Sequence, residues 1–96
     1  MYVKIHNAQG RSVLACCDKE LLGKRLKEGK YDVTVERDFY GGELSTPEKL
    51  RELLSEAESA NIFGERAVKV AIEEGLISAG NIIRIGGVPH VQIFRI

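Results

Sequence analysis

Short stretches of alternating apolar and polar residues dominate the start of the chain, a pattern typical of half-buried β-strands. Residues 2–8 (YVKIHNA) alternate in this way, and residues 12–17 (SVLACC) form a short run of small apolar side chains. Between them, residues 9–11 (QGR) supply a turn signal. We therefore expect these two segments to form a β-hairpin.

The next segment changes from a strand-like to a helix-like period. Residues 19–29 (KELLGKRLKEG) place three leucines on one helical face, Asp18 is suited to cap the N-terminus, and Gly29 is suited to end the helix. Gly23 lies inside this segment and would weaken a helix by about 1 kcal/mol relative to alanine. Residues 31–36 (YDVTVE) alternate again and are rich in β-branched side chains, which predicts a third strand.

Two further helices are expected in the middle of the chain. Residues 37–44 (RDFYGGEL) show no clear period and predict a long loop, after which Thr46 and Pro47 are a strong helix start. Apolar residues then recur at helical spacing on both sides of residues 61–64 (NIFG), and Gly75 is suited to end the second helix. The pattern predicts a helix–turn–helix pair.

The end of the chain has the pattern of a second hairpin. Residues 82–85 and 88–96 are rich in apolar side chains, and Gly86-Gly87 can form a two-residue turn because glycine accepts positive φ. The predicted order of elements is β-β-α-β-α-α-β-β. This order indicates a single α+β domain over residues 1–96, with helices packed on one face of a mainly antiparallel sheet.

Charge and cysteine usage limit the classes of function. The 96 residues include 14 basic and 14 acidic side chains, so the formal net charge is zero. Proteins that hold duplex nucleic acid through many phosphates usually carry an excess of cations, so any nucleic-acid contact here must be local, and electrostatic membrane binding is disfavoured. Cys16 and Cys17 lack the spacing of a zinc or redox motif, and with no long apolar run they indicate a cytoplasmic protein with reduced thiols.

Candidate catalytic and metal-binding residues are few. His6, His90 and the two cysteines do not show the paired spacing of a zinc site, and no phosphate-binding or dinucleotide-binding glycine motif is present. A cysteine activated by His6 across the hairpin would be a nucleophile, but free cysteines more often pack as small core residues. We expect no metal and no cofactor.

Three segments combine flexible backbone or a helix end with a ring or a charge. Residues 39–42 (FYGG) and 86–90 (GGVPH) could hold a ligand through backbone N–H groups or stack a base on Tyr40, although glycine pairs also simply form turns. In the segment 61–66 (NIFGER), Arg66 lies at the helix end that disfavours a cation. A surface ion pair, or a partner such as a phosphate, would account for it.

The same segments carry a resemblance to a known family. Residues 39–42 (FYGG), 60–68 (ANIFGERAV) and 85–92 (IGGVPHVQ) together resemble the archaeal family called domain of unknown function 424, over essentially the whole chain. The resemblance implies a small cytoplasmic protein, an association with translation components and RNA binding, and it implies no catalytic residue. We expect Cys16-Cys17 to vary among relatives, which argues against cysteine chemistry.

The resulting hypothesis is a binding module for RNA or a translation-associated protein. One alternative is a small enzyme with His90 as general acid or base and Glu65 as its partner. Another is a protein-interaction subunit, such as a homodimer that pairs an edge strand containing Val91, Ile93 and Ile96. The expected binding patch consists of Tyr40, Gly41, Gly42, Asn61, Glu65, Arg66, Gly86, Gly87 and His90.

Overall fold

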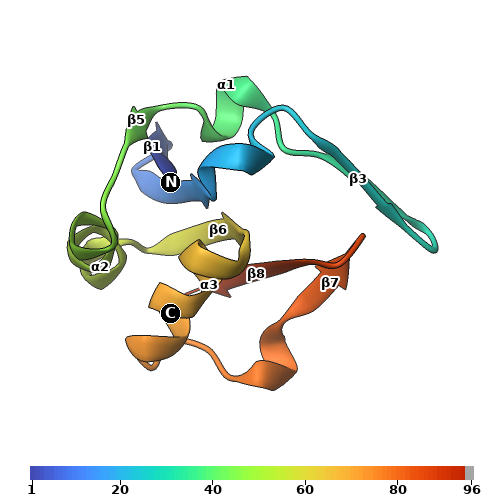
Figure 1. Cartoon of the computed structure of the whole chain (residues 1–96). Coiled ribbons are helices and arrows are strands. Elements are labelled where there is room, and N and C mark those ends of the chain that lie inside the picture. Colours follow the sequence, from blue (N-terminus) through green and yellow to red (C-terminus); the bar gives the residue numbers. More distant parts are fainter. Residues whose placement is uncertain (95–96) are drawn as a thin grey trace.

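A six-stranded sheet forms the centre of the structure, a computed structural model that describes residues 1–94 apart from the side chain of Ala8 (Figure 1). The strand order is β5-β1-β2-β6-β8-β7, and every neighbouring pair is antiparallel except β2 with β6. The strands of this sheet are β1 (Tyr2–Ala8), β2 (Arg11–Cys17), β5 (Glu43–Leu44), β6 (Ser59–Phe63), β7 (Ile83–Ile85) and β8 (Val88–Phe94). A separate antiparallel hairpin consists of β3 (Arg25–Glu28) and β4 (Tyr31–Thr34).

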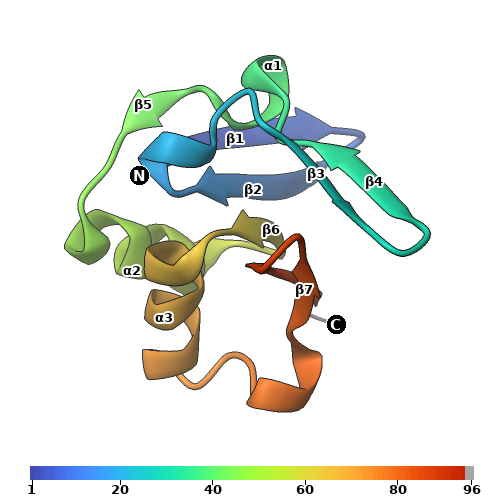
Figure 2. The ribbon, with the colours of Figure 1, turned by 45° about the vertical axis from the view of Figure 1, so that its right-hand side comes forward.

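Helices connect these strands. The described residues form α1 (Arg37–Tyr40), α2 (Pro47–Glu56) and α3 (Glu65–Glu73), with short 3-10 turns η1 (Lys19–Leu21) and η2 (Ala79–Asn81). The helix start predicted at Thr46 and Pro47 is confirmed, because the Thr46 hydroxyl accepts the Lys49 backbone N–H at 3.1 Å. α2 and α3 lie next to one another on one side of the sheet (Figure 2).

Both predicted hairpins are confirmed. β1 pairs with β2 from Tyr2 opposite Cys17 to Ala8 opposite Arg11. β7 pairs with β8 across Gly86-Gly87, whose φ angles of 60° and 79° are the left-handed values that a two-residue hairpin turn requires. The predicted last strand ran to residue 96, and its final two residues lie outside the described part of the chain.

The predicted helix over residues 19–29 is wrong. Only the turn η1 forms, the chain reverses at Gly23 with φ of 85°, and the remaining residues form strand β3. The Gly23 N–H donates to the Val35 carbonyl, and Leu26 packs inward while its neighbours Arg25 and Lys27 are exposed. The leucines do share one buried side, as expected, but they reach it through a turn and a strand.

The predicted helix–turn–helix pair is also wrong in its middle, because residues 59–63 form β6 between the two helices. This strand lies inside the sheet, with β2 on one side and β8 on the other. Its sequence SANIF does alternate, with Ala60 and Ile62 buried and Ser59 and Asn61 half-buried. The alternation spans only five residues with two polar side chains, so the segment resembles a turn between two helices. The segment 37–44 likewise holds α1 and β5 rather than an irregular loop.

Two hydrophobic cores lie on opposite faces of the sheet. The first face packs against α2 and α3, and its buried residues include Leu14, Cys16, Leu50, Leu54, Ile62, Val68, Val91 and Ile93. The second face packs against η1, the β3–β4 hairpin and α1, and its buried residues are Ala15, Cys17, Leu21, Leu26, Val35, Tyr40, Phe63 and Ile85. The α+β class and the mainly antiparallel sheet with two helices on one face are therefore confirmed, while the predicted element order is not.

Candidate functional site

A continuous row of five aromatic rings crosses the second face of the sheet. His6 stacks on Phe39 with ring centroids 4.4 Å apart, and Phe39 meets Tyr40 edge-on at 4.9 Å. Tyr40 meets Phe63 edge-on at 5.6 Å, and Phe63 stacks on His90 at 3.9 Å. Phe39, Tyr40 and Phe63 thus form the middle of the row, and a histidine lies at each end.

Hydrogen bonds to the backbone fix both histidine rings. His90 Nδ1 lies 2.9 Å from the Ile62 carbonyl oxygen, which can only accept, so Nδ1 carries the proton and Nε2 is an acceptor. His6 donates in the same way from Nε2 to the Phe39 carbonyl at 2.8 Å. The Nε2 atom of His90 has no hydrogen-bond partner within residues 1–94. Because no unpaired polar side-chain atom of these residues is buried, Nε2 is in contact with solvent.

Burial of the His90 ring favours its neutral form. It lowers the pKa of His90 below the ordinary value of 6.5, and the bond to the Ile62 carbonyl opposes part of this shift. At neutral pH the ring therefore presents a hydrogen-bond acceptor, not a positive charge.

His90 lines a groove of about 500 Å³ between the β3–β4 hairpin and strands β7 and β8. Two aromatic side chains at this groove are exposed, Tyr31 by 41% and Phe94 by 74%. Ile83 is exposed by 42%, and Gln92 adds an amide beside His90 on the same face of β8. Figure 2 shows the β3–β4 hairpin projecting towards the β7 side of the sheet. We call this surface the Tyr31–Phe94 groove.

The hairpin beside this groove carries a local excess of positive charge. Residues 24–33 contain four basic and two acidic side chains. Both acids are engaged, since Asp32 pairs with Arg25 at 2.6 Å and Glu28 accepts the Gly86 backbone N–H at 2.9 Å. Lys24, Lys27 and Lys30 remain as exposed cations on a protein whose net charge is zero.

The residues of the predicted FYGG segment have structural roles. Tyr40 is only 6% exposed and its ring is packed between Phe39 and Phe63, and burial raises the pKa of its hydroxyl. The Gly41 N–H donates to the Arg37 carbonyl and the Gly42 N–H to the Tyr40 carbonyl. A Cβ on Gly42 would overlap the Val3 carbonyl oxygen, so close backbone packing explains this glycine.

Other predicted patch residues are divided between two places. Asn61 is half-buried opposite Gln92, on the same face as Phe63 and His90. Gly86 and Gly87 lie at the β7–β8 turn, where the Gly86 N–H is bound by Glu28. Asn61 and His90 therefore share one face of the sheet. Ligand binding by the patch stays a prediction.

Glu65 and Arg66 begin α3. The Glu65 carboxylate accepts a hydrogen bond from Arg84 at 2.8 Å. Arg84 pairs in register with Pro89, one residue away from His90, so the side chains of Arg84 and His90 point to opposite faces of the sheet. Glu65 and His90 therefore do not face a common position, and this geometry does not support them as an acid–base pair.

Asp18 is a buried residue whose role differs from the one predicted from the sequence. Its side chain is 3% exposed and accepts the backbone N–H groups of Arg66 at 3.0 Å and Ala67 at 2.9 Å. Asp18 thus caps α3 from a distant strand end, not the helix predicted to follow it. The side chain of Arg66 is exposed, and its ion-pair or phosphate partner stays a prediction.

The cysteines are core residues. Both are 0% exposed, and burial raises the pKa of Cys16 to about 12 and that of Cys17 to about 11. Neither thiol is available as a thiolate near neutral pH. Among residues 1–94 no three histidine, cysteine or acidic side chains converge as metal ligands.

Comparison with known proteins places the chain in a family. The profile of a family described as "Protein of unknown function (DUF424)" matches residues 6–96. The chain belongs to this family. Its structure is similar to the crystal structure of an uncharacterized conserved protein from the archaeon Methanopyrus kandleri, with a TM-score of 0.80 and 35% sequence identity over 99% of this chain and 92% of that one. No curated protein matches the chain significantly.

The DUF424 fold of this chain has no helix, within its described residues, with the length and hydropathy needed to cross a membrane.

Proposed function

We propose that this DUF424 protein is a non-catalytic binding module for single-stranded RNA, and that the Tyr31–Phe94 groove receives unpaired bases. The observation that carries the proposal is the pair of exposed aromatic rings at one groove beside the open acceptor nitrogen of His90. Proteins recognise unpaired bases by stacking them on aromatic rings and bonding their edges.

The polar groups of the groove suit a base edge. His90 Nε2 accepts a hydrogen bond, and the Gln92 amide both donates and accepts. An adenine amino group together with its neighbouring ring nitrogen is a donor–acceptor pair of the matching kind. Tyr31 and Phe94 supply the stacking surfaces, which any base can use.

The charge distribution suits a short contact with the RNA backbone. The three exposed lysines of residues 24–33 stand on the hairpin that borders the groove. They allow a few phosphate contacts without the large basic surface that duplex binding needs. Such a module would act in the cytoplasm beside translation components, as the family resemblance implies.

Fluorescence anisotropy with labelled single-stranded RNA at low salt tests this function. We expect binding by the wild-type protein, weaker binding to an RNA duplex, and a loss of about 5- to 100-fold in affinity for Phe94→Ala or Tyr31→Ala, because each removes a stacking surface. Tyr31→Phe keeps the ring and is expected to bind nearly as well as wild type.

Ile72→Ala is the matched control, since Ile72 is 44% exposed on α3, away from the groove. It is expected to leave the affinity unchanged. Absence of binding to any single-stranded RNA at low salt would contradict the proposal, and so would equal losses for Phe94→Ala and Ile72→Ala.

A further inference from the structure

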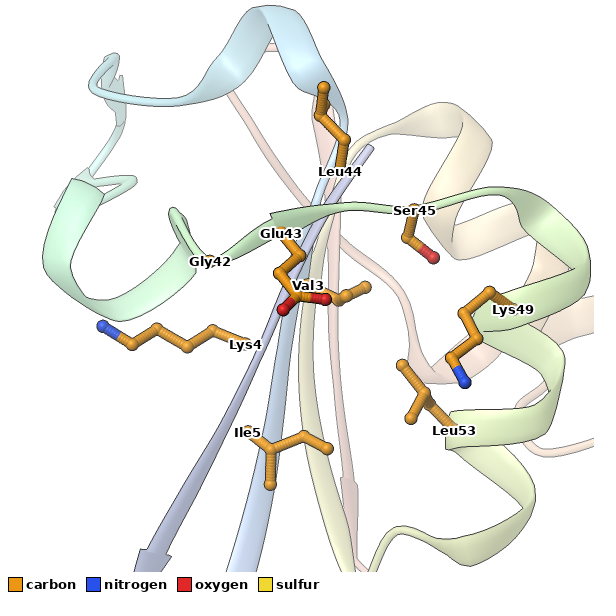
Figure 3. A pocket seen from close by; sticks show the side chains of 9 residues that line it. All are labelled: Val3, Lys4, Ile5, Gly42, Glu43, Leu44, Ser45, Lys49 and Leu53. Carbon is orange, nitrogen blue, oxygen red and sulfur yellow. The ribbon is translucent and has the colours of Figure 1, made fainter.

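A second groove runs along the opposite edge of the sheet, between β1 and α2. Figure 3 shows it with β5 crossing one end, Lys4 pointing towards α1, and Lys49 and Leu53 projecting from α2. Its volume is about 480 Å³, and a further hollow of about 220 Å³ continues it past Ile5 and Leu53 to Asn7 and Glu56. Ile5 is exposed by 50% although it belongs to a strand of the central sheet.

The edge of β1 beside this groove is open. β5 pairs only with Tyr2 and Val3, and the backbone of Gly42 lies close against Lys4. From Ile5 onward, β1 has β2 on one side and no strand partner on the other among the described residues. An open strand edge beside exposed apolar side chains is a surface on which another strand can pair.

The side of α2 that borders the groove has a self-complementary order of charges. Lys49, Leu53 and Glu56 follow one another along the groove, while the other flank of α2 is tied to α3 by the pair Arg51–Glu73 at 3.1 Å. Lys49 is in the first turn and Glu56 in the last, and the helix macrodipole disfavours both placements. Lys49 also forms an exposed ion pair with Glu52 of the same helix at 3.6 Å, a kind of contact that contributes little to helix stability. The positions of these two charges along the groove are therefore not set by the macrodipole.

We propose that this edge binds a second copy of the same chain, with β1 pairing antiparallel to β1 of the other copy about a two-fold axis near His6 and Leu53. Side by side, β1 and α2 run in the same direction, since Val3 lies near Lys49 and Asn7 near Glu56. The axis therefore brings Leu53 against Leu53 of the second copy and Lys49 against Glu56 of the second copy. A two-fold interface requires such self-complementarity.

This inference does not rest on RNA binding. The shared edge is formed by β1 and α2, whereas the Tyr31–Phe94 groove lies at the β7–β8 end of the sheet. A dimer of this kind would display two such grooves at the outer ends of one continuous sheet. The edge named from the sequence is different: Val91 and Ile93 are core residues of β8, and Ile96 lies outside the described residues.

Sedimentation equilibrium over about a hundredfold range of protein concentration tests the inference. We expect a mass that rises towards twice 10.6 kDa. Lys49→Glu alone and Glu56→Lys alone should each weaken the dimer by about tenfold or more, because each places like charges across the axis. The double variant should restore the dimer, because the exchanged charges again oppose their counterparts.

Each single variant replaces a charge that the macrodipole disfavours with one that it favours. Lys49→Glu also removes the exposed pair with Glu52, which contributes little to stability, so both variants are expected to fold. Ile5→Arg should abolish the dimer, whereas its matched control Ile83→Arg, on the opposite edge of the sheet, should not. A monomer at every concentration would overturn the inference. So would a dimer that Ile5→Arg leaves intact or that the double charge exchange fails to restore.

RNA affinity separates this result from the proposed function. Lys49→Glu is expected to lose the dimer and to bind single-stranded RNA as wild type does. A wild-type protein that stays monomeric but binds RNA would overturn only the dimer, and one that dimerises but binds no RNA would overturn only the proposed function.

Discussion

The carboxylate of Asp18 occupies the place where a side chain at position 64 would begin, and it bonds two N–H groups at the start of α3. Gly64 has φ of 112°, a conformation that other residues rarely adopt. Gly64, in the segment 61–66 (NIFGER), therefore leaves room for the buried Asp18 cap. Gly42 likewise leaves room for the Val3 carbonyl oxygen, so close packing explains both glycines.

Gly64→Ala is expected to destabilise the protein by about 3 kcal/mol or more, because it adds backbone strain and displaces the Asp18 cap. Gly75→Ala is the matched control: Gly75 also has positive φ, 71°, but a Cβ there would meet open space. It should cost only about 1–2 kcal/mol. Urea unfolding measures both values, and equal losses would contradict the role given to Asp18.

His90 makes folding dependent on pH. Burial lowers its folded-state pKa, so the unfolded chain binds more protons as the pH falls through the ordinary value of 6.5. The contribution of this ring to stability is complete above that pH and is lost as the pH falls towards the folded-state pKa. The slope for one proton is at most about 1.4 kcal/mol per pH unit.

The matching measurement compares the free energy of unfolding of wild type and His90→Gln at about pH 7.5 and about pH 5.5. The wild type should lose more stability on acidification than the variant, which has no titrating ring at this position. Parallel losses in the two proteins would show that His90 is not a buried neutral ring.

At the scale of elements, the two hairpins were predictable because their turn residues and alternation are local signals. The strand β6 was not, because residues 59–63 alternate over only five positions, include two polar side chains and interrupt a helical spacing, a pattern that resembles a turn between helices. The helix expected at residues 19–29 failed for a different reason. Leu21 and Leu26 reach the same core by way of a reversal at Gly23, and helical spacing imitates this arrangement.

The β3–β4 hairpin depends on one buried side chain. Leu26 is 8% exposed and packs with Ile85 under the hairpin, so Leu26→Ala is expected to cost about 2–4 kcal/mol. Thermal unfolding followed by circular dichroism measures this loss. Ile72→Ala, at an exposed position of α3, should change stability by less than about 0.5 kcal/mol. A comparable loss from both variants would mean that Leu26 does not anchor the hairpin.

At the scale of the whole molecule, the sheet has two faces with different uses. One is closed by α2 and α3, and the other is only partly covered, which leaves the Tyr31–Phe94 groove open. The sequence motifs indicated His90 and Asn61, which share this second face. They did not indicate Tyr31 or Phe94, because residues 31 and 94 are distant in sequence and come to line one groove only in the folded chain.

A chain with zero net charge and one cluster of lysines should show a shallow salt dependence of RNA binding. With two or three phosphate contacts, the slope of log K against log salt is expected to be about −1.4 to −2.1. Anisotropy titrations at several salt concentrations measure it. A slope steeper than about −4 would require a much larger basic surface than residues 24–33 provide.

The most direct test of RNA binding in the groove is a map of amide chemical shifts by nuclear magnetic resonance, recorded while unlabelled single-stranded RNA is added. The shifts are expected to concentrate on residues 31–33 and 90–94, and on Lys27 and Lys30 beside them. Shifts confined to the α2 and α3 face, or no shifts at saturating RNA, would contradict the binding function proposed for this protein.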